Sequence, residues 1–204
     1  MSDDKRIAIE LNRVAGGLVS SEDVANTSGE YKKFTGIIDW SGSHGQVRNA
    51  TFGLDSHGIV WKGGVWENGT WRDGIWMSGV WKRGFWESGS WRGGTWWYGL
   101  WENGTWDGGT WWDGDWVDGI WKDGIWKYGA WTDGTWKRGF WKDGTWMNGT
   151  WMNGTWMNGT WKEGIWENGI WFGGRWYAGK WKNGKWEMGT DKRGVGHSGS
   201  PDSW

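Results

Sequence analysis

The chain has 204 residues, with 23 basic and 24 acidic side chains and a formal net charge of −1. This balance gives no overall attraction to nucleic acid or to an anionic membrane, so nucleic acid is not an expected partner. The chain has 30 Trp, 41 Gly and no Cys, which excludes disulfides, thiolate metal sites and cysteine nucleophiles. Aliphatic residues are scarce, so an ordered core must be built from Trp, each of which buries roughly 150–250 Å².

The N-terminal segment, residues 1–54, lies outside the repeat that dominates the chain. Residues 6–11, "RIAIEL", alternate in hydropathy and predict either a strand or one amphipathic helical turn. Residues 34–40 predict a short strand, and residues 49–61 are expected to cap the first unit of the repeat. We therefore predict that residues 1–54 form a docking, oligomerisation and capping segment.

Residues 55–190 carry a five-residue repeat, W-x-[ND]-G-[TIV]. Trp occurs at every fifth position from Trp61 to Trp186, and Gly at every fifth position from Gly64 to Gly189. Thr, Ile or Val precedes Trp in 17 of the 26 units, and Asn or Asp precedes Gly in 13. A period of five fits neither a helix nor a plain strand, and repeated glycine argues against a helix.

Two architectures remain for this repeat. Short strands joined by Asn-Gly or Asp-Gly turns would give a long meander with every Trp on one face. Alternatively, each unit is one wall of a coil, and the coils stack into a solenoid with Trp inside and outward Thr, Ile or Val. The meander exposes a row of Trp, so we favour the solenoid.

The residue after Trp suggests the number of walls. When the residues that follow Trp are grouped by taking every fourth unit, four sets result. One set is basic, one acidic, one mixed and one largely apolar. We therefore predict an all-β fold, a four-sided β-solenoid with about 20 residues per coil and a length of about 31 Å at the usual strand spacing. The core is predicted to be a stack of Trp, with Gly turning the corners at positive φ and making room for Trp. Residues 191–204, which are polar and rich in Gly and Ser, predict a flexible C-terminal tail.

The pairs from Gly64–Trp66 to Gly184–Trp186 resemble the small and large inward residues of the pentapeptide-repeat family, with Gly for Ala and Trp for Leu or Phe. This resemblance implies a right-handed four-sided β-helix and implies no function. The W-x-x-G-x tract over residues 55–190 is also similar to Trp/Gly tracts in structural proteins of tailed bacteriophages. That similarity implies a virion component of the tail, baseplate or fibre.

No arrangement of residues predicts catalysis or a cofactor. His44, His57 and His197 lack metal-ligand spacing, and Asp113, Asp115 and Asp118 lack the spacing of a calcium loop. The glycines belong to the five-residue step and not to a phosphate-binding loop. We therefore expect no enzyme, no cofactor and no metal site.

Two surfaces follow from a coil of four units. The first is a candidate interaction face of outward apolar side chains, namely Met77, Val80, Trp97, Leu100, Val117, Ile120, Phe140, Met157 and Tyr177. Contiguous exposed apolar strips commonly mark contact surfaces. The second is a candidate basic stripe, namely Lys62, Lys82, Lys122, Lys142, Lys162 and Lys182.

These patterns predict a non-enzymatic structural or assembly protein. Its partners would be other structural proteins, or further copies of the chain through residues 1–60. The alternative is a carbohydrate-binding or adhesive module in which Trp97, Trp112, Phe172 and Tyr177 stack on the sugars of a cell-surface glycan. No apolar run is long enough to span a membrane, and residues 1–17 lack the apolar stretch of a secretory signal. We expect the protein in a virion, or in the cytoplasm before assembly.

Overall fold

The computed structural model describes residues 5–9, 32–34, 47–55, 58–66, 70–71, 75–82, 85–86 and 88–203. Residues 5–9 form a helical turn, followed by β1 (Lys32–Phe34), β2 (Val47–Asp55) and β3 (Gly58–Trp66). Two-residue strands follow, each made of a Trp and the residue before it. They are β4 (Thr70–Trp71), β5 (Ile75–Trp76), β6 (Val80–Trp81), β7 (Phe85–Trp86), β8 (Ser90–Trp91), β9 (Thr95–Trp96), β10 (Leu100–Trp101), β11 (Thr105–Trp106), β12 (Thr110–Trp111), β13 (Asp115–Trp116), β14 (Ile120–Trp121), β15 (Ile125–Trp126), β16 (Ala130–Trp131), β17 (Thr135–Trp136), β18 (Phe140–Trp141), β19 (Thr145–Trp146), β20 (Thr150–Trp151), β21 (Thr155–Trp156), β22 (Thr160–Trp161), β23 (Ile165–Trp166), β24 (Ile170–Trp171), β25 (Arg175–Trp176), β26 (Lys180–Trp181) and β27 (Lys185–Trp186). The chain ends with β28 (Gly189–Thr190), β29 (Gly196–His197) and the 3₁₀ turn η1 (Pro201–Ser203).

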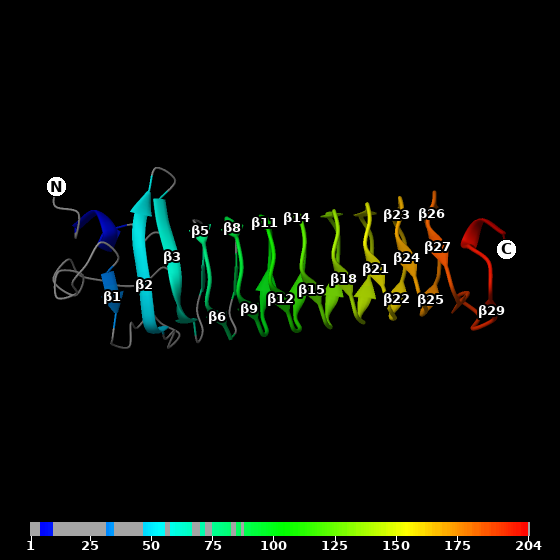
Figure 1. The fold of residues 1–204 in the computed structure, drawn as a ribbon, viewed down its shortest axis with the longest axis horizontal. Helices are drawn as coiled ribbons and strands as arrows, with labels where there is room; N and C mark the ends of the chain where they lie inside the picture. Colours follow the sequence, from blue (N-terminus) through cyan, green and yellow to red (C-terminus); the bar gives the residue numbers. More distant parts are fainter. Residues whose placement is uncertain are drawn as a thin grey trace.

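The strands build a parallel β-solenoid in which every third strand pairs. Leu100 of β10 lies opposite Asp115 of β13, and Thr105 of β11 lies opposite Ile120 of β14, so three of the five-residue units close one coil. Three walls result, which stack evenly along the long axis (Figure 1). Wall A contains β5, β8, β11, β14, β17, β20, β23 and β26. Wall B contains β6, β9, β12, β15, β18, β21, β24 and β27. Wall C contains β4, β7, β10, β13, β16, β19, β22, β25 and β28. The long strand β3 starts both wall A and wall B.

The prediction of an all-β solenoid with stacked Trp is confirmed, and the prediction of a four-sided coil is wrong. Five-residue units serve as walls, as in the pentapeptide-repeat resemblance, but three of them close a coil. The eight steps from Trp66 to Trp186 give a tryptophan column about 38 Å long at the usual strand spacing, longer than the predicted length of about 31 Å.

The indole rings explain why three walls suffice. Within a coil, Trp101 meets Trp106 edge to face, with ring centroids 6.0 Å apart and planes at 74°. Between coils, Trp101 stacks on Trp116 at 4.8 Å with planes at 6°. Trp101, Trp106 and Trp116 are completely buried. A fourth wall would separate opposite rings and open an axial channel, which no side chain is available to fill.

Backbone hydrogen bonds tie each coil to the one before it. The amide of the residue before Trp donates to a glycine carbonyl of the preceding coil, as from Thr105 to Gly89 at 2.9 Å. The amide of the residue after Trp donates to the carbonyl of a Trp, as from Lys122 to Trp106 at 2.8 Å. These units therefore add at least two inter-coil hydrogen bonds each to the stacking of the indoles.

Glycine is required at the corners for two reasons. Gly109 has φ +116°, and a Cβ at this position would lie 2.4 Å from the carbonyl oxygen of Gly94 in the preceding coil. At Gly139 a Cβ would also lie 3.3 Å from the indole nitrogen of Trp121, so glycine makes room for the core. Asn or Asp before glycine accepts the corner amide; for example, the Gly114 N–H donates to Asp113 Oδ1 at 2.7 Å.

Adjacent glycines allow a matched test of this requirement. We expect Gly109→Ala to lower the free energy of unfolding by about 2–3 kcal/mol, because alanine at positive φ is strained and the Cβ clashes with backbone. The control is Gly108→Ala, where a Cβ has no neighbour closer than 3.9 Å. It should be neutral or stabilise by up to about 1 kcal/mol. Chemical denaturation of both variants measures the difference, and equal effects would contradict the corner geometry.

The N-terminal end of the solenoid is covered by antiparallel strands. β2 pairs with β3 from Val47 opposite Trp66 to Asp55 opposite Gly58, and β1 pairs with β2. Residues 5–9 adopt the helical alternative, and Ile7 and Ala8 belong to the same buried cluster as the indoles. Residues 49–55 and 58–61, which were expected to cap the first unit, belong to β2 and β3. Phe34, the first residue of the strand predicted over residues 34–40, belongs to β1. Residues 35–40 lie outside the described residues.

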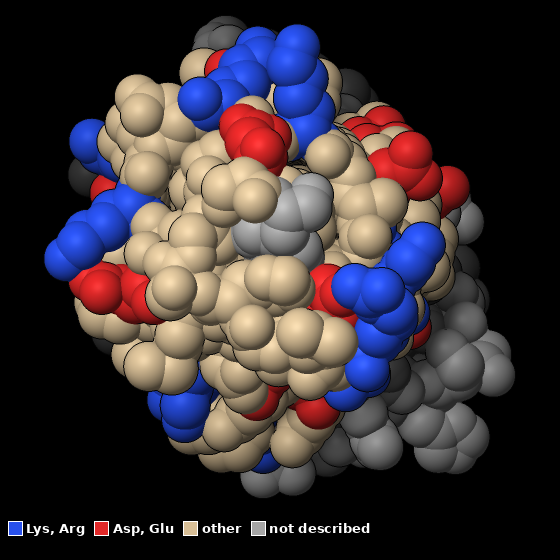
Figure 2. Space-filling model, turned by 90° about the vertical axis from the view of Figure 1, so that its right-hand side faces the viewer, with Lys and Arg blue, Asp and Glu red and all other residues tan. Residues whose placement is uncertain are grey.

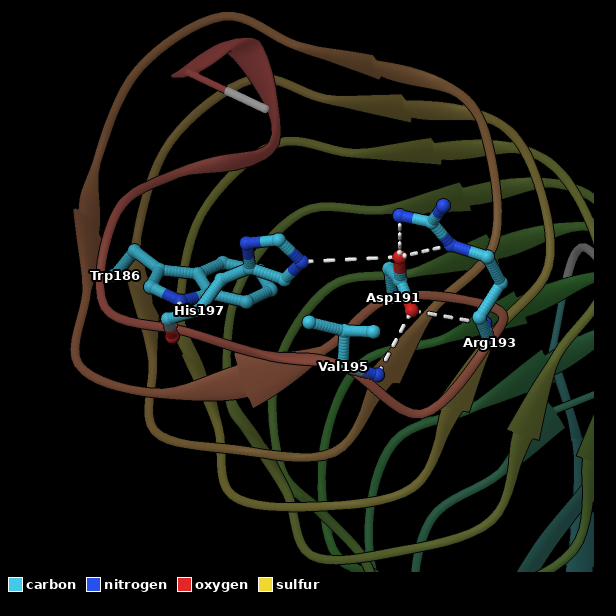
Figure 3. A network of polar contacts seen from close by, with 5 residues as sticks. All are labelled: Trp186, Asp191, Arg193, Val195 and His197. Atoms are coloured by element: carbon cyan, nitrogen blue, oxygen red, sulfur yellow. Dashed lines mark hydrogen bonds and ion pairs between the residues drawn. The ribbon is translucent and has the colours of Figure 1, made fainter.

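The C-terminal end is closed by the segment that was predicted to be a flexible tail. Asp191 occupies the position where the repeat would place the next Trp of wall C, and it is 6% exposed. Its Oδ1 accepts the amides of Arg193 and Val195 at 2.8 and 2.9 Å, and its Oδ2 accepts Arg193 Nε at 2.9 Å (Figure 3). β29 returns antiparallel to β28, and the Trp186 indole donates to the His197 carbonyl at 3.2 Å. A carboxylate thus ends the Trp series by folding the tail over the last coil.

Basic residues surround this end. The residue before Trp is never Lys or Arg from Val60 to Ile170, and is basic in each of the last three Trp units, at Arg175, Lys180 and Lys185. Viewed end-on, groups of Lys and Arg side chains lie at several places around the rim, with Asp and Glu side chains between them (Figure 2). Among the described residues no strand pairs with the outer edges of β26 and β27. Charged side chains at such an edge oppose pairing with another chain.

The Asp191 cap makes the folding stability of the protein depend on pH in the acidic range. Burial alone would raise the pKa of Asp191, but the amides of Val195 and Arg193 and the Arg193 guanidinium outweigh it and lower the pKa to about 2 from the ordinary 3.8. Because the folded pKa is depressed, the stabilisation is complete above about pH 4 and is lost as pH falls through about 2. We expect Asp191→Asn to lower the thermal midpoint at pH 7, with the difference from the parent chain shrinking between pH 4 and pH 2. A difference that stays constant over that range would contradict this role.

Candidate interaction walls

The nine residues predicted as one apolar face do not lie on one wall. Met77 and Ile120 belong to wall A. Val80, Trp97, Phe140 and Met157 belong to wall B. Leu100, Val117 and Tyr177 belong to wall C. The predicted strip followed a period of four units, and residues four units apart differ by one coil and one wall when three units close a coil.

The predicted basic stripe is divided in the same way. Lys62, Lys122 and Lys182 lie on wall A, Lys82 and Lys142 on wall B, and Lys162 on wall C. These lysines wind around the rod instead of forming one column.

The four-unit charge pattern has a different physical meaning in this fold. Three units close a coil, so an acidic residue three units before a lysine of the pattern lies directly below that lysine in the stack. Asp107 accordingly pairs with Lys122 at 2.6 Å, and Glu167 with Lys182 at 2.8 Å. With four walls, lysine would have stacked on lysine, and like charges that lie opposite on neighbouring strands are destabilising.

Exposed aromatic rings gather on one wall, which the sequence did not predict. The five most exposed aromatic side chains among the described residues lie on wall B or on the corner that follows it. They are Trp97 (42%), Tyr98 (52%), Tyr128 (40%), Phe140 (37%) and Phe172 (40%). Reading all outward and corner positions in steps of three units, instead of four, would have revealed this grouping.

The rings of wall B stack along the rod axis. Trp97 stacks on Trp112 with centroids 5.4 Å apart and planes at 16°, and the Lys127 ammonium lies 3.4 Å from the centroid of Trp112. The Lys142 ammonium lies 5.1 Å from the centroid of Tyr128. Trp112 therefore has one face against an indole and the other against a cation.

This stacking bears on the four aromatic residues considered for sugar binding. Trp97, Trp112 and Phe172 share wall B, whereas Tyr177 lies on wall C. The Lys162 ammonium lies 3.9 Å from the Tyr177 ring, and the Arg175 guanidinium 3.4 Å from the Tyr177 hydroxyl lowers the pKa of that phenol, with a further contribution from Lys162. Sugar rings stack on open aromatic faces, and Trp112 does not present one.

Corner residues form ladders of their own. Asn148 Nδ2 donates to Asp133 Oδ2 at 3.3 Å, and Asn158 Nδ2 donates to Asp143 Oδ2 at 3.2 Å, in each case across one coil. An amide above a carboxylate supplies a donor where a second carboxylate would repel.

We expect Asn148→Asp to lower the free energy of unfolding by about 0.2–1 kcal/mol at neutral pH, because it places a carboxylate above Asp133. Asn153→Asp is the matched control, since Arg138 lies one coil below that corner. Denaturation at low ionic strength should separate the two variants, and about 1 M salt should bring them together. Equal stability at low salt would contradict the ladder.

The residues considered for metal binding are dispersed. His44 and His57 lie outside the described residues, and His197 lies in the C-terminal cap. Asp113 sits on the corner after wall B, whereas Asp115 and Asp118 belong to wall C and its corner. In the described part of the chain, no three His, Asp or Glu side chains are placed to hold a metal ion. No described helix is long and apolar enough to cross a membrane.

A shallow groove lies where wall B meets the C-terminal cap. Met157, Phe172 and Met188 supply its apolar surface, and Arg175 and His197 lie at its polar side. It is open to solvent and extends over the corner where wall B turns into wall C.

Comparison with known proteins finds no family model, no curated protein and no solved structure that matches this chain.

Proposed function

We propose that this protein is a rigid structural rod that acts by contact with partners through its walls and ends, without catalysis. The observation that carries this proposal is the unbroken indole core from Trp61 to Trp171, in which each ring is at most 1% exposed. Each ring stacks on the next coil and meets its neighbours edge to face. Interdigitated aromatic packing of this kind resists bending and local opening.

Closure of both ends supports the same proposal. β2 covers the first coil, and the Asp191 segment covers the last. A rod with closed ends has a fixed length, as a defined part of an assembly requires. Removing the N-terminal segment up to residue 54 would remove most of β2 and expose the edge of the first coil. The proposal is therefore tested on the whole chain.

The more specific proposal, a virion component of a tailed bacteriophage, rests on the similarity of the W-x-x-G-x tract to tracts in such structural proteins. Mass spectrometry of purified virions, from a phage that encodes the chain, should detect it in fixed proportion to known structural proteins. Its absence from the particles would contradict the virion proposal and leave the rod proposal standing.

Stiffness can be measured by hydrogen exchange on the full chain. We expect amides of the middle coils, residues 106–161, to exchange only through cooperative opening, with protection falling toward the ends. Trp131→Ala should lower the opening free energy of its own and both adjacent coils by about 3–5 kcal/mol, because it leaves a cavity in the stack. Exchange of the middle coils on the timescale of exposed loops would overturn the proposal of a rigid rod.

A glycan-binding function has weaker support. The exposed rings of wall B favour it, but the covered faces of Trp112 and the separation of Tyr177 from the other three rings do not.

A further inference from the structure

The three walls differ in how their charges are satisfied. Between residues 88 and 183, the ion pairs of the described residues join side chains of wall A or the corner that follows it. They are Lys122 with Asp107, Lys182 with Glu167, and Arg138 with Asp123. Wall A therefore neutralises most of its charge within itself.

Wall C carries acidic residues without ion pairs. Glu102 and Asp115 point outward from it, and Asp118 and Asp133 lie on its following corner; all four are exposed. None of them forms an ion pair in the part of the chain that the structure describes. The sequence places no Lys or Arg on wall C or this corner between residues 88 and 161. The corner shared by walls B and C carries Asp113 and Asp143.

Wall B has the opposite character. Its outward positions from Val80 to Lys185 carry no Asp or Glu, and they include Lys127 and Lys142. These two ammonium groups lie on the rings of Trp112 and Tyr128 instead of pairing with carboxylates. A cation held on an aromatic face keeps its charge available to a further partner.

Apolar side chains accompany the charges on both walls. Wall B presents Trp97, Ile125 and Phe140, and wall C presents Leu100 and Val117 between its acidic residues. Two surfaces with complementary charge and interspersed apolar groups meet the usual requirements of a specific interface.

We propose that wall B of one copy of this protein binds wall C of a second copy. The partner is a second copy because the same chain carries both members of the complementary pair, in overlapping coils. This inference rests on the proposed function in one respect, since it assigns the partner that the rod contacts through its walls.

The cross-section sets the symmetry of this assembly. Three equivalent walls around one axis face about 120° apart, so contact between walls B and C turns each copy by about 60° relative to its neighbour. Six parallel rods then close a ring, with wall A facing outward. A contact that also shifts each copy along the axis would give a helical filament instead.

The test uses the full chain and light scattering at low ionic strength. The unmodified chain should form an oligomer of about six copies or a longer filament, and about 1 M salt should weaken it. Lys127→Glu with Lys142→Glu should give monomers, because it opposes carboxylates to wall C. Glu102→Lys with Asp115→Lys should also give monomers.

Mixing the two double variants is the decisive measurement. The reversed wall B of one variant fits the reversed wall C of the other, and their remaining walls retain the original contact. An equimolar mixture should therefore restore the oligomer, although each variant alone is monomeric. The matched control is Arg92→Glu on wall A, which should leave the oligomer unchanged.

Three outcomes would overturn the proposal: a monomeric parent chain, an oligomer unaffected by both double variants, or failure of the mixture to reassemble. Near-ultraviolet circular dichroism of the Trp core verifies that each variant is folded. If a variant unfolds, Lys127→Gln with Lys142→Gln and Glu102→Gln with Asp115→Asn supply milder changes, each expected to weaken association at least tenfold. Hydrogen exchange on the monomeric variants separates this proposal from the rod proposal, because a stiff monomer contradicts only the contact between walls.

Discussion

Close packing of indole rings around a single axis is the constraint on which this structure depends. Each ring is held in two directions, by an edge-to-face neighbour in its own coil and by stacked rings above and below. Trp116, for example, stacks on Trp101 and Trp131 and meets Trp111 and Trp121 edge to face. With so few aliphatic residues, no other side chain could fill the interior. The wall length, corner geometry and coil spacing all follow from the size and shape of the indole.

Glycine and the indole are matched at the corners. Coils stacked at strand spacing bring glycine backbones so close that a Cβ at Gly129 would lie 2.2 Å from the Gly114 carbonyl. The same close approach keeps the stacked rings in contact, so a side chain at the corner would loosen the core as well as strain the turn. Asn and Asp at the preceding position complete the turn by accepting the corner amide.

The surface obeys the same three-unit period and gives each wall its own character. Wall A pairs its charges internally, wall B gathers aromatic rings and lysines, and wall C is acidic. A core of identical units leaves the outward positions free to vary, so differences between walls carry whatever recognition the rod performs. The ends are distinct again, with an antiparallel hairpin at one and a carboxylate-centred turn at the other.

The sequence by itself determined the β-solenoid, the inward Trp and the glycine corners, because a five-residue step with invariant Trp and Gly allows few alternatives. It did not determine the number of walls, since either three or four of these units can close a coil. "WMNGTWMNGTWMNGT", residues 146–160, is one complete coil with three identical walls, but nothing in the sequence marks where that coil ends. The tertiary structure decided the count through the fit of three indoles about the axis. That count assigned Trp97 and Phe140 to one wall, and separated Lys122 from Lys142. The cap at Asp191 also needed the fold, because a single aspartate at a Trp position acquires its role only when the following residues turn back to donate to it.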